Sequence, residues 1–357
     1  MQKLNIRQDF CDWFCQFEHP CLITDWAKLE RWVTLDGGVV KITIPYANHE
    51  LKDALMCWIE SQFEHKYVEP FQYQISTRIK ALETHLSRSV VGVKNIIAVT
   101  SAKGGVGKST TAVNLALAFS ASGARVGLLD ADIYGPSVPL MLGTTGEKPE
   151  VRDNKWMQPI HTKGIYTQSI GYLVSQDEAA IWRGPMASKA LAQLLNETEW
   201  PDLDYLFVDM PPGTGDIQLS LAQQVPVTGA VIVTTPQDLA LADARKGAAM
   251  FEKVEVPVIG VIENMSYHIC SHCGEKENIF GIGGAVQMSQ ELSLDLLAQL
   301  PLHIQIREDI DKGLPSVVGR PNSEHAREYF ALAQKVSAKL YWCSKEKPEA
   351  ISFTMLD

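Results

Sequence analysis

The chain has 357 residues, of which 46% are hydrophobic, and a formal net charge of −10 at pH 7. This composition predicts a globular protein with a buried core and about two domains, and its acidic balance argues against non-specific binding to nucleic acid. No apolar run approaches the ~18 residues of a membrane span, and the amino-terminal stretch has no apolar signal segment, so we expect a cytoplasmic protein without a membrane partner.

Residues 1–90 are expected to form a small α+β domain that carries no recognisable catalytic motif. Residues 39–45 alternate between apolar and polar side chains, which is typical of a strand. Residues 50–63 have the spacing of an amphipathic helix, and residues 73–86 are expected to supply a further strand and a linker. The helix face that should be buried carries Leu51, Leu55, Trp58 and Ile59.

From residue 91 to residue 343 the pattern changes to strands that alternate with helices. The predicted strands are short and almost continuously apolar, as strands buried on both faces of a parallel sheet are. They cover residues 96–101, 125–130, 205–209, 230–234 and 258–262, and predicted helices cover residues 111–122, 186–196, 217–224 and 240–253. We therefore expect a doubly wound α/β domain that binds its ligand at the carboxyl ends of the strands, followed by a tail over residues 344–357.

A glycine-rich loop joins the first of these strands to the first helix. Its glycines let backbone N–H groups turn towards an anion, and the helix amino terminus adds positive potential there. Lys108 can reach the β- and γ-phosphates of a nucleotide, and the Ser109 hydroxyl can ligate Mg²⁺. The loop departs from the usual pattern at its first position, where alanine replaces glycine. The predicted phosphate-binding residues are Ala102, Lys103, Gly104, Gly105, Val106, Gly107, Lys108, Ser109 and Thr110.

Carboxylates follow two of the predicted strands. Asp130 and Asp132 lie at the end of the second strand, and Asp209 ends the third, where a Pro-Pro-Gly turn suited to a switch loop follows. Carboxylates at this edge can hold Mg²⁺ or orient a water molecule during phosphoryl transfer. An aspartate at a strand end more commonly caps a helix, but three of them beside a phosphate loop favour a nucleotide-hydrolysing site.

The chain has seven cysteines, an odd number that argues against a disulfide framework in a protein without a secretory signal. Cys270 and Cys273 form a C-x-x-C pair, which offers two of the four thiolates of a tetrahedral site. A zinc ribbon would need a second such pair, and a redox dithiol would need a thioredoxin-like unit. A symmetric dimer would instead supply two thiolates from each chain to a [4Fe–4S] cluster on its two-fold axis. The flanking His268 and His272 are interpreted as surface histidines.

The other five cysteines lack the spacing of a ferredoxin-like cluster site. Cys11 and Cys15 could share one face of a helix, but a fourth ligand would have to come from Cys57. We interpret the thiols of Cys11, Cys15, Cys21 and Cys57 as buried or adventitious, and Cys343 as a packing residue.

Several motifs together resemble a known family. Residues 103–110 are similar to the deviant Walker A loop of the ATPase class that contains MinD, ParA and the nitrogenase iron protein, and Lys103 is the additional lysine of that loop. Within this class, a resemblance to the bacterial Mrp (ApbC) iron–sulfur cluster carriers rests on the C-x-x-C pair and on the motifs at residues 130–137, 182–186, 209–216 and 263–266. The resemblance covers residues 92–340, and the amino-terminal region is only loosely similar to the small domain of some Mrp proteins.

The resemblance implies a P-loop fold, binding of ATP with Mg²⁺, and a role for each matching residue. Lys103 would reach the nucleotide of a partner subunit, Asp132 would position the attacking water, and Asp209 would serve Mg²⁺. Asn264 would read adenine through its amide. The phosphates and Mg²⁺ would also be served by three residues of the phosphate loop, namely Lys108, Ser109 and, at the α-phosphate, Thr110.

The leading hypothesis is an ATP-hydrolysing carrier that holds an iron–sulfur cluster between two copies of the chain and passes it to apo-proteins, with a cluster assembly scaffold as a further partner. Two alternatives are kept. A positioning ATPase of the MinD or ParA type would need a basic amphipathic terminus or a basic surface, and the carboxyl-terminal segment is mixed in charge and interrupted by Pro348. A structural dimer bridged by zinc would use Cys270 and Cys273 without sulfide.

Overall fold

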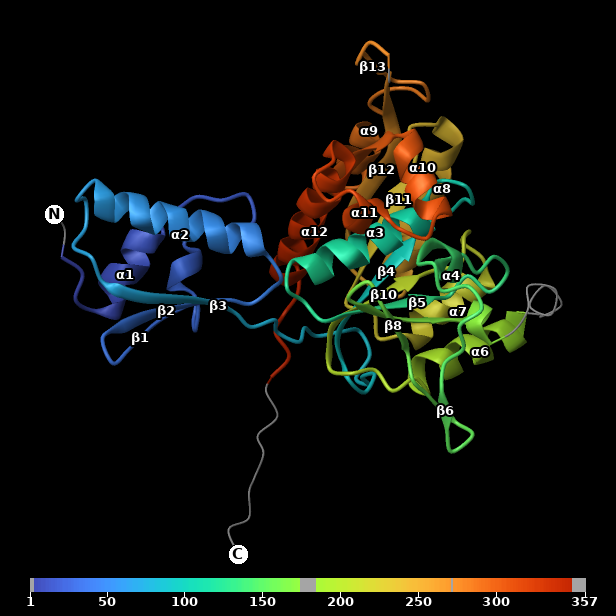
Figure 1. The fold of residues 1–357 in the computed structure, drawn as a ribbon, viewed down its shortest axis with the longest axis horizontal. Helices are drawn as coiled ribbons and strands as arrows, with labels where there is room; N and C mark the ends of the chain where they lie inside the picture. Colours follow the sequence, from blue (N-terminus) through green and yellow to red (C-terminus); the bar gives the residue numbers. More distant parts are fainter. Residues whose placement is uncertain (1–2, 174–183, 271, 349–357) are drawn as a thin grey trace, which may run out of the picture.

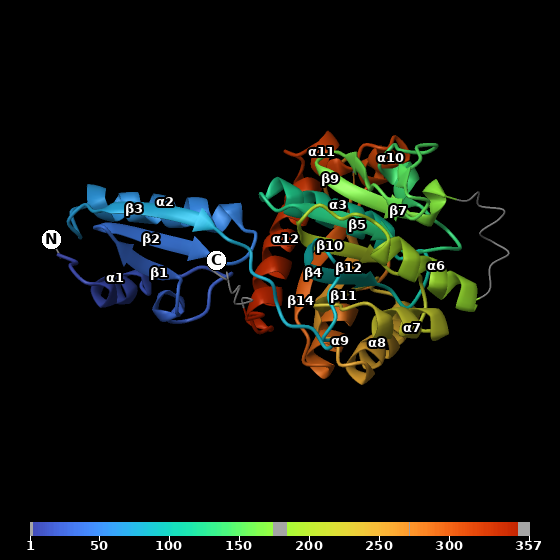
Figure 2. The ribbon, with the colours of Figure 1, turned by 90° about the horizontal axis from the view of Figure 1, so that it is seen from below.

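The structure, a computed structural model, describes residues 3–173, 184–270 and 272–348. A small amino-terminal domain lies beside a larger α/β domain, as Figures 1 and 2 show. The larger domain is built on a mostly parallel sheet with helices on both faces, which confirms the predicted doubly wound fold and the small α+β domain before it. None of the described helices combines the length and the apolar character needed to cross a membrane.

The amino-terminal domain consists of α1 (Arg7–Phe14), η1 (Trp26–Lys28), β1 (Val33–Asp36), β2 (Val39–Ile44), α2 (His49–Glu64) and β3 (Gln72–Thr77). Its sheet has the order β1–β2–β3, in which β1 pairs antiparallel and β3 pairs parallel with β2. Asn48 caps α2 by accepting the Leu51 N–H at 2.9 Å, and Leu51, Leu55 and Ile59 are buried as expected. Trp58, on the same predicted face, is half-buried.

The strands of the larger domain are β4 (Val93–Thr100), β5 (Val126–Asp130), β8 (Ile160–Thr162), β9 (Ile165–Ser169), β10 (Leu203–Asp209), β11 (Gly229–Thr234), β12 (Val258–Ile269), β13 (Lys276–Glu277) and β14 (Leu296–Leu302), beside a separate hairpin of β6 (Val151–Arg152) and β7 (Trp156–Met157). The sheet order is β13–β12–β11–β4–β10–β5–β9–β8, and β14 also pairs with β12. The pairs β8–β9 and β12–β13 are antiparallel, whereas β4, β5 and β9 to β12 pair in parallel. The five predicted strands are present, and β12 continues well beyond its expected end.

Helices cover both faces of this sheet. They are α3 (Lys108–Ala121), α4 (Val138–Met141), η2 (Ile170–Tyr172), α6 (Gly184–Asn196), α7 (Asp216–Gln224), α8 (Asp238–Lys253), α9 (Gly284–Glu291), α10 (Ile304–Asp311), α11 (Ser316–Gly319) and α12 (Glu324–Trp342). On β4, Ile97 and Val99 join a core with α3 and α12, whereas Ile96 and Ala98 face a second core with α6, α7 and α8. This alternation follows from the two-residue period of a strand and leaves only the strand ends for polar groups.

Helix α12 joins the two domains through a cluster of aromatic residues. Trp342 stacks on Trp32 with ring centroids 5.2 Å apart, and its indole N–H donates to the Cys21 carbonyl at 2.8 Å. The ring of Tyr341 lies 5.4 Å from that of Tyr46. Because α12 also packs against α3, the amino-terminal domain is attached to the face of the larger domain that these two helices cover.

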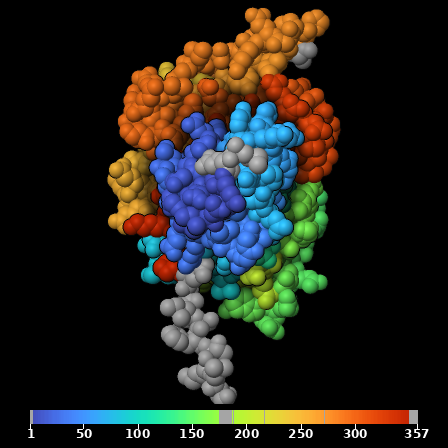
Figure 3. Space-filling model, turned by 90° about the vertical axis from the view of Figure 1, so that its left-hand side faces the viewer, coloured from blue at the N-terminus to red at the C-terminus, as the bar shows by residue number. Residues whose placement is uncertain are grey.

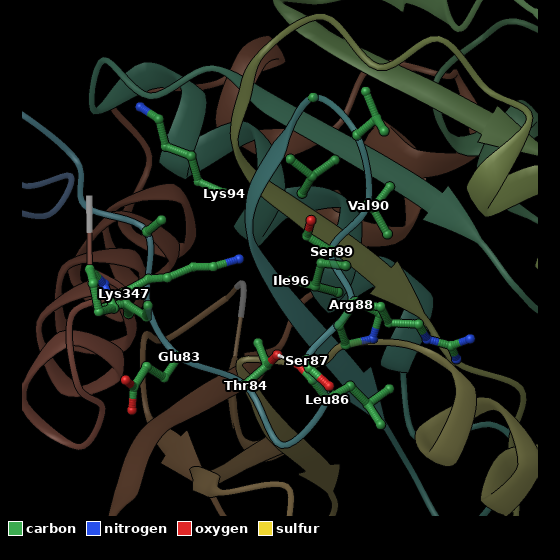
Figure 4. A pocket seen from close by; sticks show the side chains of 17 residues that line it. Glu83, Thr84, Leu86, Ser87, Arg88, Ser89, Val90, Lys94, Ile96 and Lys347 are labelled. Carbon is green, nitrogen blue, oxygen red and sulfur yellow. Dashed lines mark hydrogen bonds between the residues drawn. The ribbon is translucent and has the colours of Figure 1, made fainter. Parts of the chain in front are cut away.

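A cavity of about 540 Å³ lies where the linker between the domains meets the end of the described chain, as Figure 4 shows. The Lys347 N–H donates to the Ala81 carbonyl at 2.8 Å, so this part of the expected tail pairs with the linker. Arg88 lies on one side of the cavity in Figure 4, and Lys94 and Lys347 lie on another. The cavity borders the amino end of β4, whereas the phosphate loop follows its carboxyl end, so the two are separate.

Replacing Trp342 with alanine is expected to weaken the attachment of the amino-terminal domain. The substitution removes the ring stacked on Trp32 and the hydrogen bond to Cys21, and it should lower the free energy of unfolding by about 3 kcal/mol. Chemical denaturation followed by circular dichroism measures the loss. Trp156→Ala, at a tryptophan of the β6–β7 hairpin that is 37% exposed, is the control, and equal stabilities of the two variants would contradict the docking role.

Candidate functional site

The phosphate loop occupies the turn between β4 and α3, as the motif requires. Gly105 and Gly107 have φ values of +81° and +82°, in the left-handed region that favours glycine, and Gly107 directly precedes the first residue of α3. Residues of the loop line a hollow of about 200 Å³ together with Asp132, Met141 and Pro212. The amino end of α3 therefore opens onto a concave site, where N–H groups and the helix dipole stabilise an anion.

Lys108 and Asp209 form a buried ion pair at the carboxyl edge of the sheet. The Lys108 amine lies 2.5 Å from Oδ1 of Asp209 and 3.2 Å from the Ser109 hydroxyl, and the Lys108 and Asp209 side chains are 6% and 0% exposed. Oδ2 of Asp209 is buried without a hydrogen-bond partner in the described part of the chain. The Asp209 carboxylate and the Ser109 hydroxyl both contact the Lys108 amine, and a free carboxylate oxygen with a hydroxyl is a ligand set that suits Mg²⁺, which prefers oxygen ligands.

Asp130 and Asp132 lie beside this pair in different surroundings. Asp130 is the register neighbour of Asp209, and its buried carboxylate accepts the Ser169 hydroxyl at 3.0 Å and two backbone N–H groups. Burial, and then the negative charge of Asp209, raises the pKa of Asp130. Burial also raises the pKa of Asp132, and the Lys108 charge opposes that rise. Asp132 lines the hollow, so of these two carboxylates it is the one available to a bound nucleotide.

Asn264 lies against the phosphate loop. Its side-chain amide donates to the Val106 carbonyl at 2.8 Å, and the residue is 6% exposed. A Cβ atom on Gly107 would overlap the same amide nitrogen, so the loop needs glycine at this position. The Asn264 amide retains its oxygen and one N–H for another contact. Lys103 is half-buried on the loop, and its carbonyl accepts the Ser101 hydroxyl at 2.9 Å.

The C-x-x-C pair lies at the tip of a ribbon that continues from β12. Figures 1 and 3 show the segment around β13, coloured orange, projecting beyond the rest of the molecule. The Cys270 N–H donates to the Glu275 carbonyl at 2.9 Å, and the Gly274 N–H donates to the Cys270 carbonyl at 2.8 Å, which closes the turn. Cys270 is half-buried and Cys273 is exposed, so both thiols are accessible from outside.

The turn directs backbone N–H groups towards the sulfur of Cys270. Hydrogen bonds from the N–H groups of Cys273 and then His272 lower the pKa of Cys270, which favours the thiolate that metals bind. Within the described residues, no group of three or more His, Cys, Asp or Glu side chains is arranged to hold a metal ion, so this turn offers two thiols. The His268 ring contacts the Leu302 carbonyl through Nδ1 at 3.1 Å, and His272 is exposed.

The remaining cysteines are dispersed. Cys11 and Cys21 are buried in the core of the amino-terminal domain, Cys15 is half-buried, and Cys57 and Cys343 are exposed. The prediction that Cys343 is a packing residue is therefore wrong. Cys343 directly follows the last residue of α12, one position after the aromatic residues that do pack.

Two buried polar residues that support the site were not singled out from the sequence. Ser169 ends β9 and holds the carboxylate of Asp130, and Gln218 of α7 donates to the Pro211 carbonyl at 3.3 Å. In the sequence, only their positions could have indicated a role, since Ser169 ends a strand and Gln218 follows the Pro-Pro-Gly turn. Residues 182 and 183, which belong to one motif of the family resemblance, lie outside the described residues.

The parallel sheet, the phosphate loop with its second lysine and the buried Lys108–Asp209 pair define a P-loop NTPase of the MinD and ParA class. A solved nucleotide-binding protein from Archaeoglobus fulgidus in complex with ADP is 34% identical, with a TM-score of 0.58 over 67% of this chain and 91% of that one. The cell division ATPase MinD from Pyrococcus furiosus shares the fold, with 22% identity, a TM-score of 0.53 and coverage of 68% and 98%.

Sequence relatives narrow this class to one family. The family model described as ParA, NUBPL iron-transfer P-loop NTPase, matches residues 92–337. An iron–sulfur cluster carrier protein of Escherichia coli is 54% identical over 94% of this chain and 93% of its own length. The iron–sulfur cluster transfer protein NUBPL of Mus musculus is 49% identical over 77% and 86%. The chain therefore belongs to the family of NUBPL-type iron-transfer P-loop NTPases, which confirms the resemblance seen in its motifs.

Removing one member of the buried ion pair should lower the free energy of unfolding more than removing both members. Lys108→Ala leaves the Asp209 carboxylate buried without its cation, so we expect the free energy of unfolding to fall by about 3 kcal/mol in the absence of nucleotide. Combining Lys108→Ala with Asp209→Asn should recover most of that loss, because the uncompensated charge is gone. Urea unfolding of the single and double variants measures this non-additivity.

Lys103→Ala is the matched control, because it removes a half-buried lysine from the same loop. Its free energy of unfolding should stay within about 0.5 kcal/mol of the wild-type value. A double variant that is less stable than Lys108→Ala alone would contradict the electrostatic account of the pair.

Proposed function

We propose that the protein is an ATP-hydrolysing carrier of iron–sulfur clusters, which holds a [4Fe–4S] cluster between two copies of the chain and transfers it to apo-proteins. The observation that carries the proposal is the accessible C-x-x-C turn, whose strand also contacts the phosphate loop through Asn264. Membership of the family supports it, because relatives that span most of this chain are named iron–sulfur cluster carrier or transfer proteins.

In the proposed hydrolytic site, Lys108 holds the β- and γ-phosphates at the amino end of α3. The Ser109 hydroxyl and the free Oδ2 of Asp209 are the groups that would hold Mg²⁺. When bound, Mg²⁺ neutralises charge on the phosphate oxygens. Asp132, which lines the hollow, orients the water that attacks the γ-phosphorus, so that the bond to the ADP oxygen breaks and phosphate leaves.

Three further residues complete the nucleotide assignment. Thr110 contacts the α-phosphate, and Asn264 pairs with adenine through the oxygen and N–H that its bond to Val106 leaves free. Lys103 reaches the nucleotide of the partner subunit, so each hydrolytic site is complete only in a dimer.

A cluster at the cysteine turn would also require two copies of the chain. A [4Fe–4S] cluster takes four thiolates, and one chain places Cys270 and Cys273 in its turn. A two-fold axis between two such turns would bring four thiols together. A cluster at the tips of two projecting ribbons is open to an assembly scaffold on loading and to apo-proteins on release. We place the protein in the cytoplasm, where thiols remain reduced.

Anaerobic reconstitution of the full chain with iron and sulfide tests the carrier function. The wild-type protein should take up about four iron and four sulfide per two chains. Cys270→Ser and Cys273→Ser should each abolish this uptake, because each removes two of the four ligands from the dimer. Cys57→Ser and Cys343→Ser are matched controls that remove exposed thiols elsewhere and should load normally. Zinc without acid-labile sulfide in the wild-type protein would contradict the proposal and favour a zinc-bridged dimer.

Lys103→Ala should separate ATP binding from hydrolysis. Loss of a cation that acts on the partner's nucleotide should leave ATP affinity nearly unchanged and lower the hydrolysis rate by about 100-fold. Fluorescence titration and phosphate release measure the two quantities.

Mixing variants shows whether Lys103 acts across the dimer. A mixed dimer of a Lys103→Ala chain and an Asp132→Asn chain holds one complete site, so an equimolar mixture should recover about a quarter of the wild-type rate. A mixture as inactive as either variant alone would place Lys103 on its own chain's nucleotide and overturn its role in trans.

A further inference from the structure

Strand β12 has an irregular segment between the part that contacts the phosphate loop and the cysteine turn. Its pairing with β14 shifts register between Glu263 and Tyr267, and Met265, within the shift, has a φ of +54° in the left-handed region. Such a bulge re-aims the strand. Before the bulge, β12 lies in the main sheet between β11 and β14. After it, β12 becomes the ribbon that leads to Cys270.

One side of this bend touches the phosphate loop. The Asn264 amide donates to the Val106 carbonyl at 2.8 Å, and the Met265 methyl lies close to Gly107. The Val106 carbonyl belongs to the same peptide unit as the Gly107 N–H, which is one of the loop groups that can receive a phosphate. A phosphate on that N–H polarises the peptide unit and makes its carbonyl a stronger acceptor for Asn264.

The other side of the bend is held by a buried carboxylate. Glu263 is 1% exposed, and its Oε2 accepts the Ser266 hydroxyl and the Gln299 amide, each at 2.6 Å. Its Oε1 accepts the Ala285 N–H at the start of α9, at 3.2 Å. These three partners are neutral, so the carboxylate is kept in the interior by hydrogen bonds. None of the roles assigned above to the nucleotide site or the cysteine turn uses Glu263.

The ribbon beyond the bend is paired on both sides. His268 pairs with Glu277 of β13 and with Leu302 of β14, and the His268 ring also contacts the Leu302 carbonyl. Cys270 lies four positions after Ser266 along extended chain, which is about 13 Å at ~3.3 Å per residue. A change in the stiffness or position of Ser266 therefore reaches the cysteine turn through paired strands.

We propose that Glu263 is a positioning residue that transmits the state of the phosphate loop to the cysteine turn. Because Glu263 holds the Ser266 hydroxyl, residues 264–266 move together when the phosphate loop changes state. Bound nucleotide strengthens the contact of Asn264 with the loop and so stiffens the ribbon, and loss of nucleotide loosens it. This inference rests on the proposed function and adds to it a route by which nucleotide regulates the cluster-binding thiols.

The reactivity of the thiols in the reduced, cluster-free protein tests this link. Alkylation of Cys270 and Cys273 by iodoacetamide is followed by peptide mass spectrometry, with and without ATPγS and Mg²⁺. Saturating ATPγS should slow the alkylation of both by about fivefold, which is the low end of ordinary coupling between sites. Cys57, exposed on α2, is the internal reference and should react at one rate throughout.

Ser266→Ala removes the hydroxyl that Glu263 holds and leaves the phosphate loop untouched. This variant should bind ATPγS with an unchanged Kd and lose the effect of nucleotide on alkylation. Gln299→Leu removes a second hydrogen-bond donor to Glu263, from an exposed position of β14, and it should also reduce the effect of nucleotide on alkylation. This variant tests the link even if Ser266→Ala fails to fold. Ser289→Ala removes another buried serine hydroxyl, in α9, and as the matched control should behave like the wild type.

A Ser266→Ala protein that folds and keeps the full nucleotide effect would overturn the role of Glu263. A wild-type protein that binds ATPγS with no change in alkylation would overturn the link, and normal cluster uptake by the same protein would leave the carrier function standing. A wild-type protein that shows the nucleotide effect but takes up no cluster would support the link and overturn the carrier function instead.

Discussion

The buried ion pair between Lys108 and Asp209 is the interaction on which the rest of the site depends. Lys108 is the first residue of α3, and Asp209 is the last residue of the central strand β10, so the pair joins the phosphate loop to the sheet. Burial of either charge alone would be costly, and each is stabilised by the other. The pair thereby fixes the start of α3 against the strand end and leaves one oxygen of Asp209 free to serve a ligand.

The parallel sheet explains why this interaction lies where it does. Strands such as β4 and β10 are apolar on both faces, so polar groups gather at their carboxyl ends. Strand β12 is different because it does not stop at that edge. It bends at Met265 and carries two thiols beyond the body of the molecule. The same strand therefore contacts the phosphate loop and leads to the two thiols of the proposed metal site.

Much of this arrangement is predictable from the sequence, because local patterns determine it. Residues 96–101 are almost continuously apolar, as a strand buried on both faces is, and the glycines and lysines that follow them specify a phosphate loop at the start of a helix. Short elements escape such patterns. Helix α1 has eight residues and strand β13 has two, so neither is long enough for a repeating pattern to stand out in the sequence.

The buried polar contacts escape prediction for a related reason. Ser169 and Asp130 are 39 residues apart, and Gln299 and Glu263 are 36 apart, so no spacing in the chain marks them as partners. Cys343 follows two aromatic residues that do pack, but α12 ends there and its side chain is exposed. Sequence periodicity predicts which face of a helix is buried, whereas the residue at its end depends on where the chain turns.

The central claim is that one cluster is shared by two chains. Native mass spectrometry of the anaerobically reconstituted full-length protein tests it most directly, because the mass reports chains and cluster together. The account predicts a species of two chains with one [4Fe–4S] cluster, and single chains without a cluster when the iron is removed by a chelator. A single chain that carries the whole cluster would contradict it.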